Sequence, residues 1–343
     1  MSKISDIKIT PIMDTLRLED ISDEIYFSEK YSDYVSNSRL SLINPDQGGT
    51  PEAYFEKTPH EVTDSLILGS AVHGLILQPE SYVLVETVDR PTAKAGLMAD
   101  ELYKLKHIPS DEEIIAASDK IDYYKGKMND KKINDLRTKC NAYWSTRAVW
   151  EAANKEETRT PIFLDDKKRD VVKSVLNSFN AYAEFKKLLE PEYLLEKPTM
   201  GNEKTILLDV TAEVEGSDPF TLRLKSKLDN YIINKEANSI TVNDLKTTSK
   251  PVSYFKSAFD KYHYYRELGM YTWLLSLVAQ KFYGISKPTM NANCLVVETF
   301  PSYTSMVHVL SPKDLMRGFN EFKTLLKLVA YYKSKGYGVQ TDE

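Results

Sequence analysis

The stretch 223–246, RLKSKLDNYIINKEANSITVNDLK, constrains the fold most, because it predicts two β-strands joined by a polar turn. Apolar and polar residues alternate over about 220–233 and again over about 239–246, and this period of two is typical of strands. The polar residues 234–238 separate the two segments. We therefore expect an antiparallel hairpin within a larger sheet.

The charged residues of this hairpin gather at one place. Asp229 lies late in the first strand, and Asp244 and Lys246 lie at the end of the second, two positions apart. Because side chains alternate across a strand, 244 and 246 point to the same side, and the hairpin can bring Asp229 beside them. Two carboxylates and an ammonium group suit a hard divalent cation with a lysine next to it. A solvated strand end carrying a Lys–Asp pair explains the spacing equally well.

The composition is that of a globular protein in a reducing compartment. A chain of 343 residues can bury a sizeable core, and 42% hydrophobic with 28% charged residues is ordinary for that class. No apolar run approaches a membrane helix in length, and the N-terminus lacks the pattern of a signal peptide, so we expect neither. The two cysteines, Cys140 and Cys294, lack zinc-site spacing and favour a cytoplasmic location.

The net charge of −5 argues against indiscriminate binding to nucleic acid, but it leaves room for a local basic groove. The segment 223–267 has nine basic residues against five acidic ones, so it is locally basic within an acidic chain. Tyrosine is abundant, with 22 copies, and suits a wet, polar binding surface.

A second informative stretch is 63–80, TDSLILGSAVHGLILQPE, which predicts a mostly buried helix ended by Pro79. His73 lies one helical turn after Gly69 and next to Gly74. A glycine inside a helix costs about 1 kcal/mol, so the two glycines indicate close approach of a strand or a ligand. From this stretch alone, a core histidine beside tightly packed glycines is the simpler interpretation.

The rest of the pattern predicts helices and strands on both sides of the hairpin. We expect helices at about 34–44, 111–127, 133–155, 165–189, 262–283 and 312–333, and strands at about 194–200, 205–214, 293–300 and 303–309.

Several motifs, in this order, resemble the PD-(D/E)XK nuclease superfamily, and within it most closely the phage and prophage RecE-type exonucleases. The motif G-x-x-x-H-x-x-x-x-x-P is matched by Gly69, His73 and Pro79, the strand-end aspartate by Asp229, and D-x-K-T-T by Asp244, Lys246, Thr247 and Thr248. The segments 34–45 (YVSNSRLSLINP) and 296–303 (VVETFPSY) are also similar to the family. The resemblance spans about residues 34–335.

The resemblance implies an α/β fold of the restriction-endonuclease type, with a mixed central sheet flanked by helices and a helical N-terminal elaboration. It also implies a division of the chain. We expect an N-terminal segment at 1–33, an exonuclease domain at 34–335 with a helical insertion at about 100–190, and a tail at 336–343.

The resemblance further implies the site. Asp229, Asp244, the backbone carbonyl of Leu245 and His73 would bind Mg²⁺ or Mn²⁺, and Lys246 would orient or deprotonate the attacking water or hold the phosphate. Glu196 is an accessory candidate. The family helix that follows usually carries a glutamine where this chain has Glu267, and a carboxylate cannot donate a hydrogen bond to DNA. The expected DNA contacts are Lys225, Lys227, Thr247, Lys250, Arg266, Glu267 and Tyr271.

The function implied is a metal-dependent DNA exonuclease, 5′-to-3′ on double-stranded ends, acting in phage-type recombination. Such enzymes form ring-shaped homo-oligomers and pass single strands to an annealing protein, in the bacterial cytoplasm if phage-encoded. One alternative is a repair or CRISPR-associated nuclease on the same core, without an iron–sulfur cluster because two cysteines cannot supply four ligands. The other is a catalytically idle nuclease fold that binds DNA or a protein.

Overall fold

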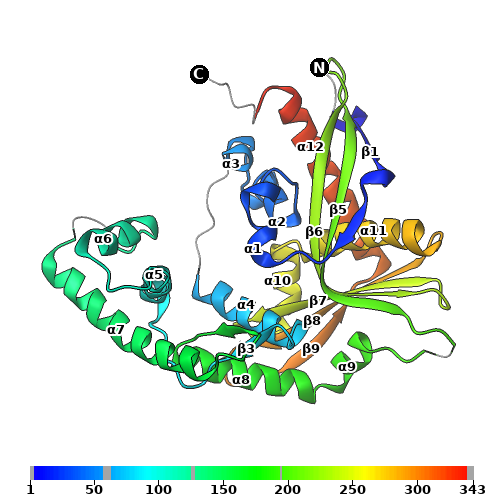
Figure 1. The fold of residues 1–343 in the computed structure, drawn as a ribbon. Coiled ribbons are helices and arrows are strands. Elements are labelled where there is room, and N and C mark those ends of the chain that lie inside the picture. Colours follow the sequence, from blue (N-terminus) through cyan, green and yellow to red (C-terminus); the bar gives the residue numbers. More distant parts are fainter. Residues whose placement is uncertain (1–3, 57–62, 125–127, 194, 338–343) are drawn as a thin grey trace. The chain divides into compact units, whose positions relative to one another are not determined.

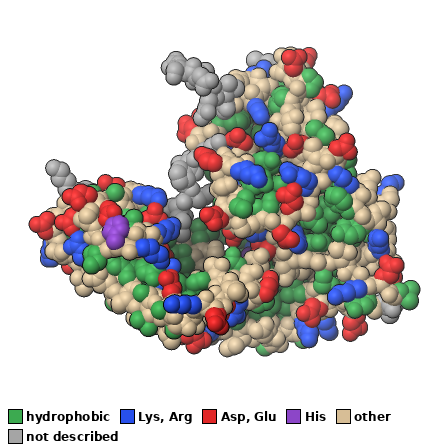
Figure 2. All heavy atoms as spheres, in the orientation of Figure 1, with side chains coloured by type: hydrophobic (Ala, Val, Ile, Leu, Met, Phe, Trp, Pro, Cys, Tyr) green, Lys and Arg blue, Asp and Glu red, His purple; other side chains and the backbone are tan. Residues whose placement is uncertain are grey.

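The computed structural model describes residues 4–56, 63–124, 128–193 and 195–337. The chain forms two compact units, the first made of 1–60 with 179–343 and the second of 61–178. Among the described residues, no helix combines the length and apolarity that a membrane crossing requires. Figure 2 shows acidic and basic side chains intermixed over the visible face, as the small net charge suggests.

The first unit is built on a seven-stranded mixed sheet that is mostly antiparallel (Figure 1). The order is β1-β5-β6-β7-β8-β9, and β2 also pairs with β5. Only β7 and β8 run parallel among these pairs. The strands are β1 (Lys8–Pro11), β2 (Arg17–Glu19), β5 (Thr199–Glu213), β6 (Phe220–Asn234), β7 (Ser239–Thr248), β8 (Thr289–Glu298) and β9 (Ser305–Val309).

The predicted hairpin is confirmed as β6 and β7, which pair antiparallel from Asn230 opposite Asn243 to Asn234 opposite Ser239. The two strands predicted at 194–200 and 205–214 are instead one strand, β5. The residues between the two predicted strands, 201–204, belong to β5 because the strand keeps pairing with β6 along this stretch. The N-terminal segment predicted at 1–33 is also part of this sheet, because it supplies β1 and β2.

Helices cover the sheet, and α11 (Tyr264–Tyr283) and α12 (Pro312–Ser334) pack against it and against each other. Their crossing is close: a Cβ on Gly318 would lie 1.8 Å from the carbonyl oxygen of Tyr265, so only glycine fits there. Ser311 caps α12 and Pro312 is its first residue, as predicted. The other α-helices of this unit are α1 (Asp23–Tyr26), α2 (Asn37–Leu40), α3 (Pro51–Phe55), α9 (Ala183–Leu189) and α10 (Phe255–Lys261).

Two predicted helices of the first unit differ in length from those observed, and in the second unit the helix expected at 111–127 ends at Lys120. The helix expected at 34–44 is reduced to α2, although Ser36 caps it by accepting from the backbone N–H of Arg39. The helix expected from about 262 begins at Tyr264, because the preceding residue, His263, has a left-handed backbone with φ +55° that no α-helix can include. Short 3₁₀ turns are η1 (Ile4–Asp6), η2 (Met13–Thr15), η3 (Glu29–Tyr31), η4 (Pro45–Gln47) and η5 (Val252–Tyr254).

The second unit is mostly helical. It contains α4 (Asp64–Leu77), α5 (Ala93–Tyr103), α6 (Asp111–Lys120), α7 (Asp130–Ala153) and a parallel pair of short strands, β3 (Tyr82–Leu84) and β4 (Thr160–Ile162). α8 (Asp166–Ala181) continues past residue 178, and a break at Tyr182 separates it from α9 where one helix was predicted. The unit thus begins well before the insertion predicted at about 100–190 and ends earlier. Of the predicted tail at 336–343, residues 338–343 lie outside the described residues.

Candidate active site

The site lies where β6 and β7 stop pairing. Their ladder ends at Asn230 and Asn243, and the next residues along are Asp229 and Asp244. Beyond this point β6 bonds to another segment, since the backbone N–H of Lys225 donates to the carbonyl of Val35 at 2.9 Å. The Asp229 side chain fills the gap, with its Oδ2 atom accepting from the backbone N–H of Leu245 at 2.7 Å. The two aspartates are therefore brought together, as the hairpin pattern predicted.

Lys246 lies between two carboxylates. Its Nζ atom is 2.8 Å from Oδ2 of Asp244 on the same strand and 2.9 Å from Oε2 of Glu267 on α11. The Tyr271 hydroxyl donates to the other oxygen of Glu267 at 3.2 Å. Glu267 is thus a direct partner of the lysine.

Glu203 is an acidic residue of this site that the sequence analysis missed. It stands opposite Asp229 in the β5–β6 register, between the pairs Asn202–Asn230 and Lys204–Leu228. Carboxylate oxygens of Glu203 and Asp229 lie within 4.8 Å of each other. The position of the preceding turn could have revealed this residue. If the turn between β5 and β6 is centred on Gly216, which has φ +82°, residue 203 lies opposite residue 229.

The carboxylates outnumber the cations here. Burial, and then the charge of Glu203, raise the pKa of Asp229 to about 7. Burial is also the main cause that raises the pKa of Asp244, with Lys246 opposing and Asp229 adding to the rise. Burial alone would lower the pKa of Lys246, but Asp244 and Glu267 hold it well above the usual range. An additional cation would relieve this excess of negative charge.

The donor set fits a hard divalent cation. Carboxylate and backbone carbonyl oxygens are the ligands that such ions prefer. Asp244 is only 2% exposed. Its Oδ2 atom forms an ion pair with the Lys246 ammonium at 2.8 Å, but it accepts no hydrogen bond of good geometry from the described residues. A buried carboxylate oxygen without an aligned donor is well suited to bind a metal ion. Asp229, Asp244 and Glu203 could therefore hold one.

Three of the predicted DNA contacts are buried in this structure: the cations Lys225 and Arg266, and Tyr271, which is part of the core. Lys225 donates from its ammonium group to the carbonyl of Tyr26 at 2.7 Å, and burial lowers its pKa to about 8. Arg266 is fully buried and bonds to Asn37, Gln47, Ser41 and Glu321. Lys225 and Arg266 join distant segments of the first unit and do not present their cations at the surface.

The remaining predicted residues are spread more widely. Lys227 pairs with Glu203 at 3.1 Å and with Asp23, so it borders the acidic cluster. Thr247 is half-buried at the end of β7, and Lys250 is exposed beyond it. Glu196 is exposed and precedes β5 instead of lying in a strand. His73 lies on α4 in the second unit, so its role as a ligand stays a prediction.

Comparisons with known proteins give distant likenesses. No family model matches this chain, and no curated protein does. One match is the crystal structure of a protein named "Putative exonuclease" from Eubacterium rectale. The match spans 94% of this chain and 89% of that protein's chain, with a TM-score of 0.46 and 10% sequence identity. A second match, to the crystal structure of protein VC1899 from Vibrio cholerae, spans 95% of this chain and 61% of that protein's chain, with a TM-score of 0.17 and 11% sequence identity.

Proposed function

We propose that the first unit is a metal-dependent deoxyribonuclease with a PD-(D/E)XK core. The observation that carries the proposal is the convergence of Asp229, Asp244 and Lys246 where β6 and β7 separate. Two coupled carboxylates with a lysine beside them are the groups needed to hold a divalent ion next to a phosphodiester. The mostly antiparallel sheet with flanking helices is compatible with such a core.

The ligands proposed are Asp229, Asp244 and the carbonyl of Leu245, with Glu203 as an added member, and His73 as suggested by the family resemblance. The ion would be Mg²⁺ or Mn²⁺, given the oxygen donors. When bound, it would supply an acidified water and stabilise charge on the scissile phosphate. Asp229 and Asp244 orient this chemistry because their positions are set by the end of the β6–β7 ladder and by the hydrogen bond from Leu245 to Asp229.

Lys246 has the role of a positioned cation. Its ammonium is held by Asp244 and Glu267, which keep the proton on Nζ and fix the direction of the side chain. From there it can donate a hydrogen bond to a phosphate oxygen or to the attacking water. Because cation binding neutralises part of the Asp244 charge, it weakens the interaction that keeps the Lys246 pKa high.

The finer proposal is a 5′-to-3′ exonuclease on double-stranded ends, in phage-type recombination, assembled as a ring and serving an annealing protein. These points are supported by the family resemblance. A repair or CRISPR-associated nuclease on the same core is the alternative enzyme. The presence together of Asp229, Asp244 and Lys246 favours an active enzyme over an idle binding fold.

Digestion of linear duplex DNA labelled at either the 5′ or the 3′ end tests the proposal. We expect degradation in Mg²⁺, none in EDTA, early release of the 5′ label, and sparing of a closed circular duplex. The Asp244→Asn variant should be inactive on every substrate. Failure of the wild type to degrade any of these DNAs in Mg²⁺ or Mn²⁺, or full activity of Asp244→Asn, would contradict the proposed function.

A further inference from the structure

Two tyrosines next to the site are exposed on the segment that follows Lys246. Tyr254 is 61% exposed and Tyr262 is 51% exposed, at the two ends of α10. The same helix buries Phe255 and Phe259, so its inward aromatic positions are filled and these tyrosines are not needed for the core. Single exposed aromatic residues are common on protein surfaces, so the neighbours of these two decide what they mean.

The neighbours of these tyrosines on the same segment are lysines. Lys250, Lys256 and Lys261 are all exposed, and the one acidic residue of the segment, Asp260, is paired with Arg317 at 2.8 Å. Within the described part of the chain, no carboxylate lies within ion-pair distance of any of the three lysines. The Lys261 ammonium lies 5.3 Å from the centre of the Tyr262 ring. Cations interleaved with exposed rings are the pattern of surfaces that bind single-stranded nucleic acid.

A series of ring contacts connects this surface to Lys246. The rings of Tyr262 and Tyr264 are 5.8 Å apart, and the Lys246 ammonium lies 4.7 Å from the Tyr264 ring. Tyr264 also stacks on Phe255 at 5.9 Å with an interplanar angle of 18°. Tyr262 is therefore separated from Lys246 by one aromatic residue.

The surface is held rigidly at both ends. At the start, the buried Glu298 carboxylate accepts from the backbone N–H of Val252 at 2.7 Å. At the end, His263, which follows Tyr262 and has a left-handed backbone, bonds through its ring to Glu321 at 2.6 Å. Anchoring the segment before binding reduces the conformational entropy that is lost when a strand is bound.

We propose that Lys250, Tyr254, Lys256, Lys261 and Tyr262, here called the α10 surface, bind an unpaired DNA strand next to the active site. A base would stack on Tyr262, with Tyr254 as a second platform, and the lysines would contact the phosphates. The inference deepens the proposed nuclease function and rests on it, because it gives the substrate strand a path that ends at Lys246.

Fluorescence anisotropy with a fluorescein-labelled oligothymidylate in EDTA tests the α10 surface without cleavage. Tyr262→Ala should weaken binding by roughly fivefold or more. Tyr262→Phe should bind like the wild type, because stacking needs the ring and not the hydroxyl group. Lys256→Ala and Lys261→Ala should each reduce the slope of log Kd against log salt by about 0.7. A blunt duplex should be unaffected by Tyr262→Ala, because its bases remain stacked.

The matched controls are Tyr193→Ala and Lys186→Ala, which alter an exposed tyrosine and an exposed lysine elsewhere in the first unit. Neither should change oligothymidylate binding. Wild-type affinity in Tyr262→Ala, an equal loss in Tyr193→Ala, or no binding by the wild type would overturn the inference. Metal-dependent cleavage that persists alongside such a result would leave the nuclease function standing. Tyr262-dependent binding without any cleavage would overturn the nuclease function and keep the α10 surface as a strand-binding site.

Discussion

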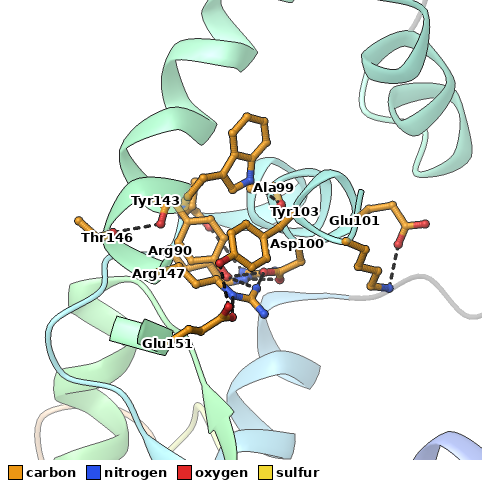
Figure 3. Close-up of polar contacts among 12 residues, drawn as sticks. Arg90, Ala99, Asp100, Glu101, Tyr103, Tyr143, Thr146, Arg147 and Glu151 are labelled. Carbon is orange, nitrogen blue, oxygen red and sulfur yellow. Dashed lines mark hydrogen bonds and ion pairs between the residues drawn. The ribbon is translucent and has the colours of Figure 1, made fainter. Parts of the chain in front are cut away.

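Two partly buried groups of charged side chains differ in how their acids are paired. One is the candidate active-site cluster of the first unit, and the other is the Asp100 cluster of the second unit. In the Asp100 cluster, the Asp100 carboxylate accepts hydrogen bonds from Arg90 at 2.7 Å, from Arg147 at 3.2 Å and from the Tyr143 hydroxyl (Figure 3). Arg147 also bonds to Glu151 at 2.9 Å. Each carboxylate there has a guanidinium partner in good geometry.

The active-site cluster instead contains an excess of carboxylates. Lys246 pairs with Asp244 and Glu267, whereas Lys227 pairs with Glu203, which lies beside Asp229. The pKa values of both aspartates are raised. In the Asp100 cluster, burial would raise the pKa of Glu151, but the hydrogen bond from Arg147 brings it below its usual range. Acids that are not balanced by nearby cations are typical of functional sites, whereas fully paired acids are typical of structural contacts.

The largest expected effect separates activity from stability. Lys246→Ala should reduce DNA cleavage by roughly a hundredfold or more, because it removes the positioned cation. Its melting temperature should change little, because the neighbouring carboxylates can take up a proton when the ammonium is lost. The control is Lys235→Ala, in the exposed turn of the same hairpin, which should cleave normally. Near-normal cleavage by Lys246→Ala would remove this lysine from the mechanism.

The second effect belongs to the Asp100 cluster. Arg147→Ala leaves Asp100 and Glu151 short of a partner and removes the cation from the faces of Tyr103 and Phe163. We expect a loss of up to about 3 kcal/mol in the free energy of unfolding, measured by urea denaturation. Arg137→Ala, on the same helix but with a more exposed partner, should cost about 1 kcal/mol or less. Equal losses in the two variants would mean that Arg147 contributes no more to the free energy of unfolding than an exposed ion pair does.

The third effect is a pH dependence with a defined sign. Asp229 and Asp244 have pKa values in the folded, metal-free protein of about 7 and about 8, above the ordinary value of 3.8. The folded state therefore binds more protons between about pH 4 and pH 8, so stability falls as pH rises through that window. The melting temperature in the absence of metal should therefore fall progressively across this window. Melting curves in EDTA across this range should show a shallower decline for Asp244→Asn; an identical decline would contradict the account.

The smallest effect concerns Glu267. Glu267→Gln introduces the glutamine that is usual in the nucleases the sequence resembles, and it removes one of the charges that raise the pKa of Lys246. The limb of the pH–rate profile that reports Lys246 should move to lower pH, with only a few-fold change in the maximal rate. Tyr271→Phe removes a hydrogen bond to Glu267 but leaves its charge, so its profile should move less. A shift to higher pH in Glu267→Gln would show that Glu267 does not act on Lys246 through its charge.

The hairpin and the meeting of Asp229, Asp244 and Lys246 could be predicted because they follow from alternation within one local segment. Glu203 could not be found from its own surroundings, because the residues around it resemble a turn and only pairing with β6 makes them a strand. Its discovery required the register of the preceding hairpin.

The predicted DNA contacts show a different limit. Lys225 and Arg266 are cations in a basic segment, yet their partners, Tyr26 and Glu321, are distant in the sequence. Residue type indicates charge but not burial, so the local pattern gave no means of separating these two from the exposed Lys250. The bounds of the second unit were missed for the same reason, because they depend on which segments pack together.

The most direct test of the central claim is a Mg²⁺ titration followed by melting temperature. The wild type should be stabilised progressively, by about 2.7 kcal/mol when Mg²⁺ reaches about a hundred times its Kd. Asp229→Asn and Asp244→Asn should each lose most of that gain, and either variant can melt above the wild type in EDTA because one repulsive charge is gone. Absence of any Mg²⁺-dependent shift in the wild type, or an undiminished shift in both variants, would show that Asp229 and Asp244 are not the metal site.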